Sequence, residues 1–449
     1  MFDVSKKTVL LSYVTQFFQY GVTLLILPVI LTGLSSLDLG IWYLFLSVSS
    51  MVSLLDFGFN PSLQRNVAYV FSGARRLLKD GYEKEPQGHV DYYLLKSLVF
   101  TSKIIYQRIS VCILLLASTF GTLYITYSLK EHYSSMIVFV WLLFVLTTSM
   151  NFYFGFLLPF VKGRGKITEY NLIVIISKSG FLLTLFFLIY LKVGVLSLVV
   201  ATLVNSVLTI SLSSRAFLNG EEKTELSKID TPPINLFDVI WQNAKNTGIV
   251  NVGVFLFSQT GIFLSGLFLS LNDVAQIGLT LQLFSALIVV CRVYFYTVIP
   301  KISSMWISSS LIEIKKLFIK SQMIGYAFFF VGLFILLRWG NLLLSNIIHS
   351  NVLLPSSTVI LLYGFFYFME ITHGNCCTLI STMNKIPFTR SAIVAGCVSC
   401  LLTIVFVKFD LGMISFPLAL ICGSLPYNSW KWPLEIYKIF STTSVSKLQ

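Results

Sequence analysis

Five polar residues follow one another at helical spacing inside an apolar stretch near the start of the sequence. They are Ser49, Ser53, Asp56, Asn60 and Gln64. Because each lies three or four residues after the last, we expect them to share one face of a helix. Polar and ionisable residues inside membrane segments are costly and often functional. The stripe is therefore expected to line a cavity or a contact between helices.

Asp56 is the charged member of this stripe. It precedes Arg65 by nine residues, about 13 Å along a helix, which predicts a position near mid-membrane. Gly58 and Pro61 follow it and are expected to unwind the helix, freeing carbonyl groups for an ion or water. Asp56 could couple transport to an ion or pair with a basic residue in a cavity. It could equally be structural, capping or pairing within its own bundle.

Arg292 is the matching candidate in the second half of the chain. It follows Asp273 by 19 residues, much as Asp56 follows Asp38 by 18. We hypothesise that Asp56 and Arg292 occupy equivalent places in two related halves. A planar guanidinium can grip two phosphate oxygens, which suits a pyrophosphate. The alternative is a structural pair with Asp56 or Glu370. The other residues expected on the face of Arg292 are Gln282, Ser285 and Tyr296.

Two more cations fall within or beside apolar segments. Lys178 follows Lys166 by 12 residues, roughly 18 Å along a helix, which is long for a snorkelling lysine. We therefore expect Lys178 to face a cavity, with Asn171 earlier on the same face. Arg108 comes only five residues after Lys103, and we expect it at the membrane interface.

Glu370 and His373 form an acid–base pair at i, i+3 in a later apolar segment. An acid beside a histidine inside a bundle could exchange protons near physiological pH. The pair could equally be a local polar patch that holds helices together. The sequence leaves both roles open.

Catalytic and metal chemistry are poorly supported. All seven cysteines fall in apolar stretches, and the pair Cys397 and Cys400 lacks the second pair of a zinc site. The segment Gly163–Lys166, "GRGK", is too short for a phosphate-binding loop. We expect no enzyme activity and no cofactor. Energy would come from an H⁺ or Na⁺ gradient or from consumption of the cargo downstream.

The composition indicates the elements that must position these residues. Hydrophobic residues make up 56% of the 449-residue chain and charged residues 11%, with a mean hydropathy of +0.82. Apolar stretches of about 20 residues, the length that crosses a bilayer, recur from end to end. We predict an all-α polytopic membrane protein. Its twelve expected spans are 9–32, 40–63, 107–129, 136–160, 171–191, 194–214, 248–271, 275–299, 320–344, 353–380, 389–407 and 411–427.

The distribution of basic residues predicts the orientation. All but seven of the 32 Lys and Arg residues fall on one side if both termini are cytoplasmic. Topology thus explains the net charge of +13, and a nucleic-acid partner is not expected. A weak internal repeat, "GKITEYN" at 165–171 against "NKIPFTR" at 384–390, favours two six-helix lobes around a central cavity. The expected domains are a lobe at 1–214, a connector at 215–246, a lobe at 247–427 and a tail at 428–449.

Two stretches carry a family resemblance. Residues 27–74, "LPVILTGLSSLDLGIWYLFLSVSSMVSLLDFGFNPSLQRNVAYVFSGA", resemble the opening of Wzx-type polysaccharide (O-antigen) flippases. Residues 162–170, "KGRGKITEY", also resemble that family. These flippases belong to the multidrug/oligosaccharidyl-lipid/polysaccharide exporter (MOP) superfamily. The C-terminal half has no comparably sharp motif.

The resemblance implies a flippase of the bacterial inner membrane that serves O-antigen or other lipopolysaccharide synthesis. Its implied cargo is an undecaprenyl-pyrophosphate-linked oligosaccharide, carried from the cytoplasmic to the periplasmic leaflet by alternating access. Such a protein would contact membrane lipids, could contact the polysaccharide polymerase machinery, and could run as an ion antiporter. Arg292 and Lys178, with Asn60, Gln282 and Tyr296, are the expected cargo-binding residues. Asp56, Glu370 and His373 are the expected coupling or charge-pairing residues.

Two other functions stay open at this point. A drug or organic-ion exporter of the same superfamily would use the same helical layout. Two intramembrane cations, Arg292 and Lys178, against two acids, Asp56 and Glu370, argue weakly against a cavity that selects cations. A membrane-embedded glycan polymerase or glycosyltransferase is disfavoured because the expected external loops are very short.

Overall fold

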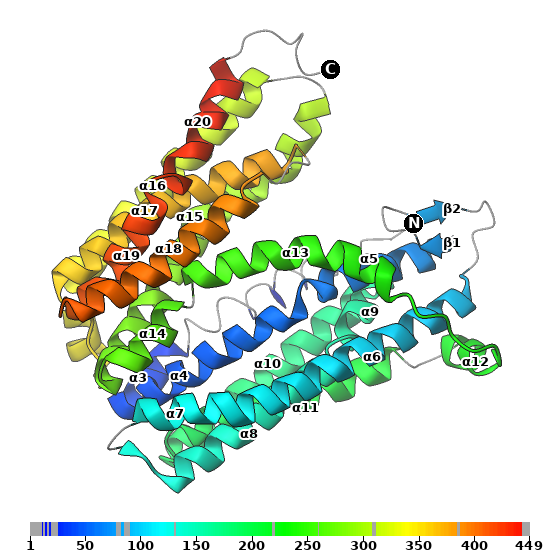
Figure 1. Ribbon diagram of the computed structural model, residues 1–449, viewed down its shortest axis with the longest axis horizontal. Helices are drawn as coiled ribbons and strands as arrows, with labels where there is room; N and C mark the ends of the chain where they lie inside the picture. The colour runs from blue at the N-terminus through cyan, green and yellow to red at the C-terminus, as the bar shows by residue number, and fades with distance from the viewer. Residues whose placement is uncertain are drawn as a thin grey trace. The chain divides into compact units, whose positions relative to one another are not determined.

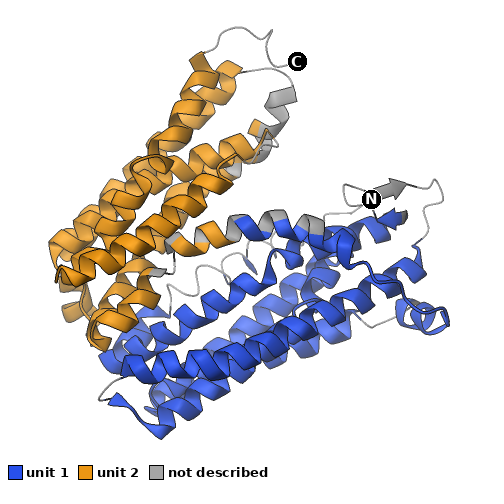
Figure 2. Cartoon of the chain, in the orientation of Figure 1, with its two compact units in different colours: residues 1–251 blue, residues 252–449 orange. Residues whose placement is uncertain are grey.

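The chain is almost entirely helical in its computed structural model, as the apolar periodicity predicts. The structure describes residues 11, 14, 15, 18, 26–77, 82–84, 90–129, 132–217, 221–258, 260–307, 311–383 and 387–441. The chain divides into two compact units, residues 1–251 and 252–449 (Figure 2). Each unit is described by itself. The predicted connector 215–246 falls inside the first unit, and the predicted domain boundaries stay a prediction.

Unit 1 holds a bundle of helices and one small hairpin (Figure 1). Its elements are α3 (Leu27–Gly33), α4 (Ser36–Ser53), η2 (Leu54–Asp56), α5 (Phe59–Phe71), β1 (Ala74–Leu77), β2 (Tyr82–Lys84), α6 (Tyr92–Leu116), η3 (Ala117–Gly121), α7 (Thr122–Leu129), α8 (Ser135–Tyr153), α9 (Leu157–Gly163), α10 (Ile167–Tyr190), α11 (Leu196–Phe217), α12 (Glu221–Ser227) and the first part of α13 (Phe237–Ser258). The strands β1 and β2 pair antiparallel. The helices α6, η3 and α7 follow one another without interruption and form one long rod.

Unit 2 holds the remaining helices. They are the end of α13, then α14 (Thr260–Phe268), α15 (Leu271–Ile307), α16 (Leu311–Leu342), η5 (Leu343–Ile347), α17 (Ser357–Ser381), α18 (Thr389–Lys408), η6 (Gly412–Ile414), α19 (Ser415–Ser424) and α20 (Asn428–Ser441). Trp432 and Ile436 of α20 are buried in one apolar cluster with Phe295 of α15 and Leu379 of α17. The last helix is therefore packed onto the unit.

Eight helical segments of the described residues are long and apolar enough to cross a membrane. They are Ser36–Asp56, Tyr92–Leu129, Ser135–Gly163, Ile167–Tyr190, Leu196–Phe217, Leu271–Tyr296, Leu311–Ile347 and Thr389–Lys408. The predicted spans 248–271, 353–380 and 411–427 also coincide with helices, whereas the first predicted span, 9–32, falls largely outside the described residues. The predicted class, an all-α polytopic membrane protein, is confirmed.

The same capping motif begins one long helix in each unit. Asp38 accepts a hydrogen bond from the Ser35 hydroxyl at 2.7 Å, and the Asp38 amide donates to Ser35 Oγ at 3.1 Å. Asp273 and Ser270 repeat this arrangement at 2.8 and 3.2 Å. Such boxes satisfy amides that the first turn leaves without partners. The two aspartates that anchored the repeat in the sequence are therefore the third residues of helix-capping boxes.

Asp38 has one further contact. Its Oδ1 accepts a hydrogen bond from the Val195 amide at 3.1 Å, next to Gly194, which has a φ of 67°. A Cβ at Gly194 would lie 3.0 Å from Asp38 Oδ1. Asp38 thus joins the start of α4 to the turn before α11.

These contacts predict different costs for two matched substitutions. Asp38→Ala removes the carboxylate half of the capping box and the Val195 hydrogen bond, whereas Asp273→Ala removes only the carboxylate half of its box. We expect about 1 kcal/mol from the lost carboxylate half of each box and about 1 kcal/mol more for Asp38→Ala, which also loses the Val195 bond. Thermal unfolding of the purified protein in detergent should show the larger drop in melting temperature for Asp38→Ala. Equal drops would contradict the joining role of Asp38.

Candidate functional site

The polar stripe that begins at Ser49 does not lie on one continuous helix. The helix α4 ends at Ser53, and Phe57 and Gly58 have φ values of 42° and 73° before α5 begins at Phe59. The break occurs where Gly58 predicts it, since glycine adopts positive φ without strain. Pro61 lies in the first turn of α5, where its missing N–H costs nothing. The predicted common face is wrong because the left-handed residues Phe57 and Gly58 interrupt the helix between Ser53 and Asn60, so that helical spacing no longer relates the two ends of the stripe.

Asp56 is held at this break by two hydrogen bonds. The Tyr106 hydroxyl donates to Oδ1 at 3.1 Å, and the Asn60 amide donates to Oδ2 at 3.4 Å. Asp56 also ends a 21-residue apolar span that begins at Ser36, so it lies about 30 Å from that end. Since the hydrocarbon core is about 30 Å thick, Asp56 belongs near its boundary. This span length favours a position near the boundary of the core, and the predicted mid-membrane position stays a prediction.

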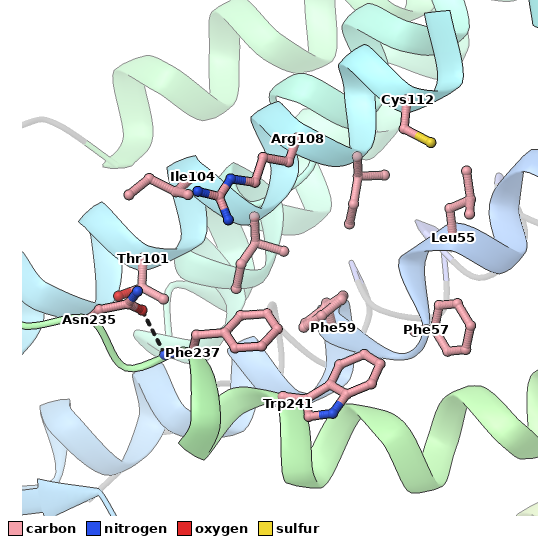
Figure 3. A pocket seen from close by; sticks show the side chains of 12 residues that line it. Leu55, Phe57, Phe59, Thr101, Ile104, Arg108, Cys112, Asn235, Phe237 and Trp241 are labelled. Atoms are coloured by element: carbon pink, nitrogen blue, oxygen red, sulfur yellow. Dashed lines mark hydrogen bonds between the residues drawn. The ribbon is translucent and has the colours of Figure 1, made fainter. Parts of the chain in front are cut away.

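A cavity of about 480 Å³ lies beside Asp56 within unit 1. One wall is the face of α6 that carries Thr101, Ile104, Ile105, Arg108, Ile109 and Cys112; Leu55 and Asn235 also line the cavity. Figure 3 shows Arg108 on this wall, with its guanidinium toward Ile104. Facing it is an aromatic floor, defined as Phe57, Phe59, Phe237 and Trp241. The lining is mainly apolar.

The aromatic floor is one packed set of rings. Trp241 lies with its ring centroid 5.9 Å from that of Phe57, 5.8 Å from that of Phe59 and 5.9 Å from that of Phe237. The ring of Phe237 is stacked on Trp241 with an angle of 11° between the planes. These spacings are within the range of favourable aromatic pairs. The floor is therefore formed by the break after α4 together with the first turns of α13.

The segment before α13 is fixed to α6 by side-chain hydrogen bonds. The Tyr93 hydroxyl donates to the Pro232 carbonyl at 3.0 Å, and Lys96 donates to the carbonyl of Ile229. The Ile234 and Leu236 amides donate to Ser97 Oγ and Thr101 Oγ1 at 3.1 and 2.9 Å. These bonds position Phe237 and Trp241 over the cavity. No local pattern in the sequence indicates the cavity, because its floor joins residues that are far apart along the chain of unit 1.

A second group of candidates meets in unit 2. Arg292 Nη2 donates to the backbone carbonyl of Glu370 at 2.7 Å. Its guanidinium lies directly over Gly374, so that a Cβ there would collide with it. His373 Nδ1 is 3.3 Å from Glu370 Oε2, and His373 Nε2 is 3.3 Å from Cys377 Sγ. We call Arg292, Glu370, His373, Gly374 and Cys377 the Arg292 cluster.

In the Arg292 cluster, His373 and Arg292 contact different groups of Glu370. The carboxylate of Glu370 is paired with His373, while Arg292 binds the Glu370 main chain. No ion pair joins Arg292 to a carboxylate among the described residues. A backbone carbonyl carries only a partial charge, so the positive charge of Arg292 is not cancelled by its direct partner. One alternative predicted for Arg292 is a structural pair with Glu370. The contact between these residues is a hydrogen bond from Arg292 to the main-chain carbonyl of Glu370.

The other candidate residues lie outside the Arg292 cluster, either elsewhere on α15 or in unit 1. Tyr296 is on α15, about 6 Å along the axis from Arg292, and is exposed, while Gln282 is about 15 Å from Arg292 in the opposite direction and half-buried. Lys178 on α10 is half-buried, with its ammonium 5.7 Å from the Phe181 ring centroid. Asn60 is exposed on the first turn of α5.

The predicted equivalence of Asp56 and Arg292 also stays a prediction. Asp56 belongs to unit 1 and Arg292 to unit 2. Their local settings differ, because Asp56 lies at a helix break whereas α15 runs on as an α-helix past Arg292.

The chain resembles solved transporters over nearly its whole length. A MATE-family multidrug resistance transporter of the MOP superfamily, in an inward-facing conformation, is 11% identical, with a TM-score of 0.67 over 91% of this chain and 95% of that chain. The lipid II flippase MurJ, in an inward closed conformation, is 12% identical, with a TM-score of 0.68 over 97% of this chain and 88% of its own. A MOP-superfamily transporter from Pyrococcus furiosus Vc1 is 11% identical, with a TM-score of 0.55 over 97% and 96%.

Comparison with protein-family models and with curated proteins gives no match. At 11–12% identity, the likeness to solved structures concerns the fold. The chain has the fold of MOP-superfamily transporters, to which MATE transporters and MurJ both conform.

The position of Arg292 can be tested through Gly374. Gly374→Ala alone places a methyl group against the guanidinium and should lower the melting temperature, since overpacking typically costs about 1–3 kcal/mol. In an Arg292→Ala background the collision is gone, and the same change should be neutral or stabilising because alanine favours helices. Thermal unfolding of the four proteins checks this cycle. Equal effects of Gly374→Ala in both backgrounds would exclude the contact.

Proposed function

We propose that this protein is a flippase of the bacterial inner membrane. It moves an undecaprenyl-pyrophosphate-linked oligosaccharide unit from the cytoplasmic to the periplasmic leaflet by alternating access. The resemblance of residues 27–74 to Wzx-type flippases supports this proposal, as does the fold likeness to a lipid II flippase. Both termini lie in the cytoplasm in this proposal, as the basic residues predict.

The observation that carries the proposal is the setting of Arg292. Its guanidinium is in a long apolar helix, is partly buried, and binds a main-chain carbonyl in place of a carboxylate. Maintaining a charge in such a place is costly, and an anionic cargo head would compensate it when bound. The guanidinium offers the planar pair of donors that a pyrophosphate accepts. Lys178 supplies a second cation in the other unit, without a carboxylate partner among the described residues.

The same fold also serves drug export in the MATE transporters, and this is the alternative function. An exporter of organic cations would need an acid free to meet the substrate. Glu370 is paired with His373, and Asp56 is hydrogen-bonded to Tyr106. The settings of these two acids favour the anionic cargo.

A reconstituted system tests the cargo and the role of Arg292 together. Proteoliposomes would contain a short-chain, fluorescent, pyrophosphate-linked oligosaccharide, and translocation would be followed by its accessibility to an impermeant quencher. We expect Arg292→Ala to slow translocation at least tenfold, with partial rescue in Arg292→Lys, because a hydrogen bond between charged groups contributes about 1.5–3 kcal/mol. Arg338→Ala, which removes a cation of α16, is the matched control and should remain near wild type. Full activity of Arg292→Ala at normal protein levels would contradict the proposal.

We further propose that the Glu370–His373 pair couples transport to protons. Protonation of Glu370 would break its pairing with His373 and change the electrostatic surroundings of the guanidinium one turn away. Glu370→Gln mimics the protonated acid and should make translocation insensitive to an imposed pH gradient, while translocation without a gradient continues. The measurement is the translocation rate with and without the gradient. An unchanged response to the gradient in Glu370→Gln would exclude this coupling, and the flippase proposal would stand without it.

A further inference from the structure

The lining of the cavity beside the aromatic floor has one charged side chain, the exposed Arg108. Thr101 Oγ1 accepts the Leu236 amide at 2.9 Å and donates to the Ser97 carbonyl at 2.8 Å. Asn235 Oδ1 accepts the Phe237 amide at 2.9 Å. Arg108 has no hydrogen bond or ion pair with any residue in the described part of the chain. The cavity therefore offers a ligand an apolar surface and a single guanidinium.

The length of the helices places this guanidinium relative to the bilayer. The 21 residues 109–129 that follow Arg108 contain no Asp, Glu, Lys or Arg. They span about 31 Å as a helix, which matches the hydrocarbon thickness of about 30 Å. The span Ser36–Asp56 has the same length and ends at Asp56, which is hydrogen-bonded to Tyr106, two residues before Arg108. Two independent spans thus place Arg108 at the same boundary of the hydrocarbon core.

The cavity extends to both sides of this boundary. Cys112 lines it on the hydrocarbon side of Arg108, and Thr101 and Ile104 line it on the other side (Figure 3). Ile109, the residue after Arg108 on α6, also lines the cavity. The volume of about 480 Å³ is within the range of small-molecule sites, about 300–1,000 Å³. An amphiphile with its chain beside Ile109 and its phosphate beside Arg108 would match both the apolar surface and the charge.

We infer that this cavity binds one anionic phospholipid of the surrounding bilayer, with a hydrocarbon chain on the aromatic floor and the phosphate paired to Arg108. A phosphodiester carries one negative charge, and one guanidinium can bind two of its oxygens. A pyrophosphate carries more negative charge than Arg108, the single cation in the lining of this cavity, can balance. The lipid site is separate from the cargo role of Arg292 and does not depend on the proposed function. A bound lipid would hold the break after α4 against α6 and α13.

Photo-crosslinking of the full-length protein in lipid nanodiscs tests the site. The probes are phosphatidylglycerol with a diazirine in its chain, phosphatidylcholine with the same chains, and a diazirine-bearing undecaprenyl phosphate. Phosphatidylglycerol should label peptides containing residues 101–112 and 235–241, several times more than phosphatidylcholine. Arg108→Gln should reduce this labelling about tenfold, the loss expected for one charged hydrogen-bonding pair, and Arg108→Lys should restore part of it.

Two further variants serve as controls. Lys103→Gln removes an exposed cation on α6 that does not line the cavity, and its labelling should equal that of the wild type. Ile109→Trp fills the chain end of the cavity and should reduce labelling while Arg108 is intact; its melting temperature shows whether it folds. Labelling elsewhere, equal labelling by phosphatidylcholine, or no effect of Arg108→Gln would overturn the inference. Labelling by undecaprenyl phosphate alone would overturn the assignment to a bilayer phospholipid.

Discussion

A charge in or beside an apolar helix is costly unless a polar group meets it, and this constraint shapes the settings of Arg292 and Asp56. Arg292 meets a main-chain carbonyl and lies over a glycine, Gly374, which leaves room for the guanidinium. Asp56 meets the Tyr106 hydroxyl and a main-chain amide at the point where α4 stops. Each charge is thus stabilised by a neutral group and is not neutralised by an ion pair among the described residues. It can therefore still attract a ligand of opposite charge or respond to a change of conformation.

The break after α4 has a second consequence. Main-chain groups freed at a break are tolerated only where protein or water covers them. Here the left-handed pair Phe57 and Gly58 turns the chain, and Phe57 packs on Trp241 of α13. A Cβ at Gly248 of α13 would lie 2.9 Å from the carbonyl oxygen of Phe57. The break, the aromatic floor and the cavity are therefore one structural feature, and a change at any of them should affect the others.

Much of the fold follows from periodicity alone. Apolar runs of bilayer length mark most spans, and Ser-x-x-Asp before an apolar run marks the starts of α4 and α15. Gly58 marks a break because it tolerates positive φ. The single-helix stripe failed at this same glycine, since a face defined by spacing exists only while the helix continues. The mid-membrane position predicted for Asp56 was measured from Arg65, which lies on α5 beyond the break, whereas the span that begins at Ser36 favours a position nearer the boundary.

By itself, the sequence determined the class of protein, its helical spans and the charged residues that are costly in a bilayer, because these depend on local spacing and composition. Only the tertiary structure decided which groups meet. The Ser62 hydroxyl reaches the Ile240 carbonyl across 178 residues of sequence, and Arg292 selects the carbonyl of Glu370 over its carboxylate. The cavity beside Arg108 also depends on the tertiary structure, because its lining residues come from three separate segments of the chain. Such contacts are set by how helices pack, and packing brings together residues whose separation along the chain carries no local signal.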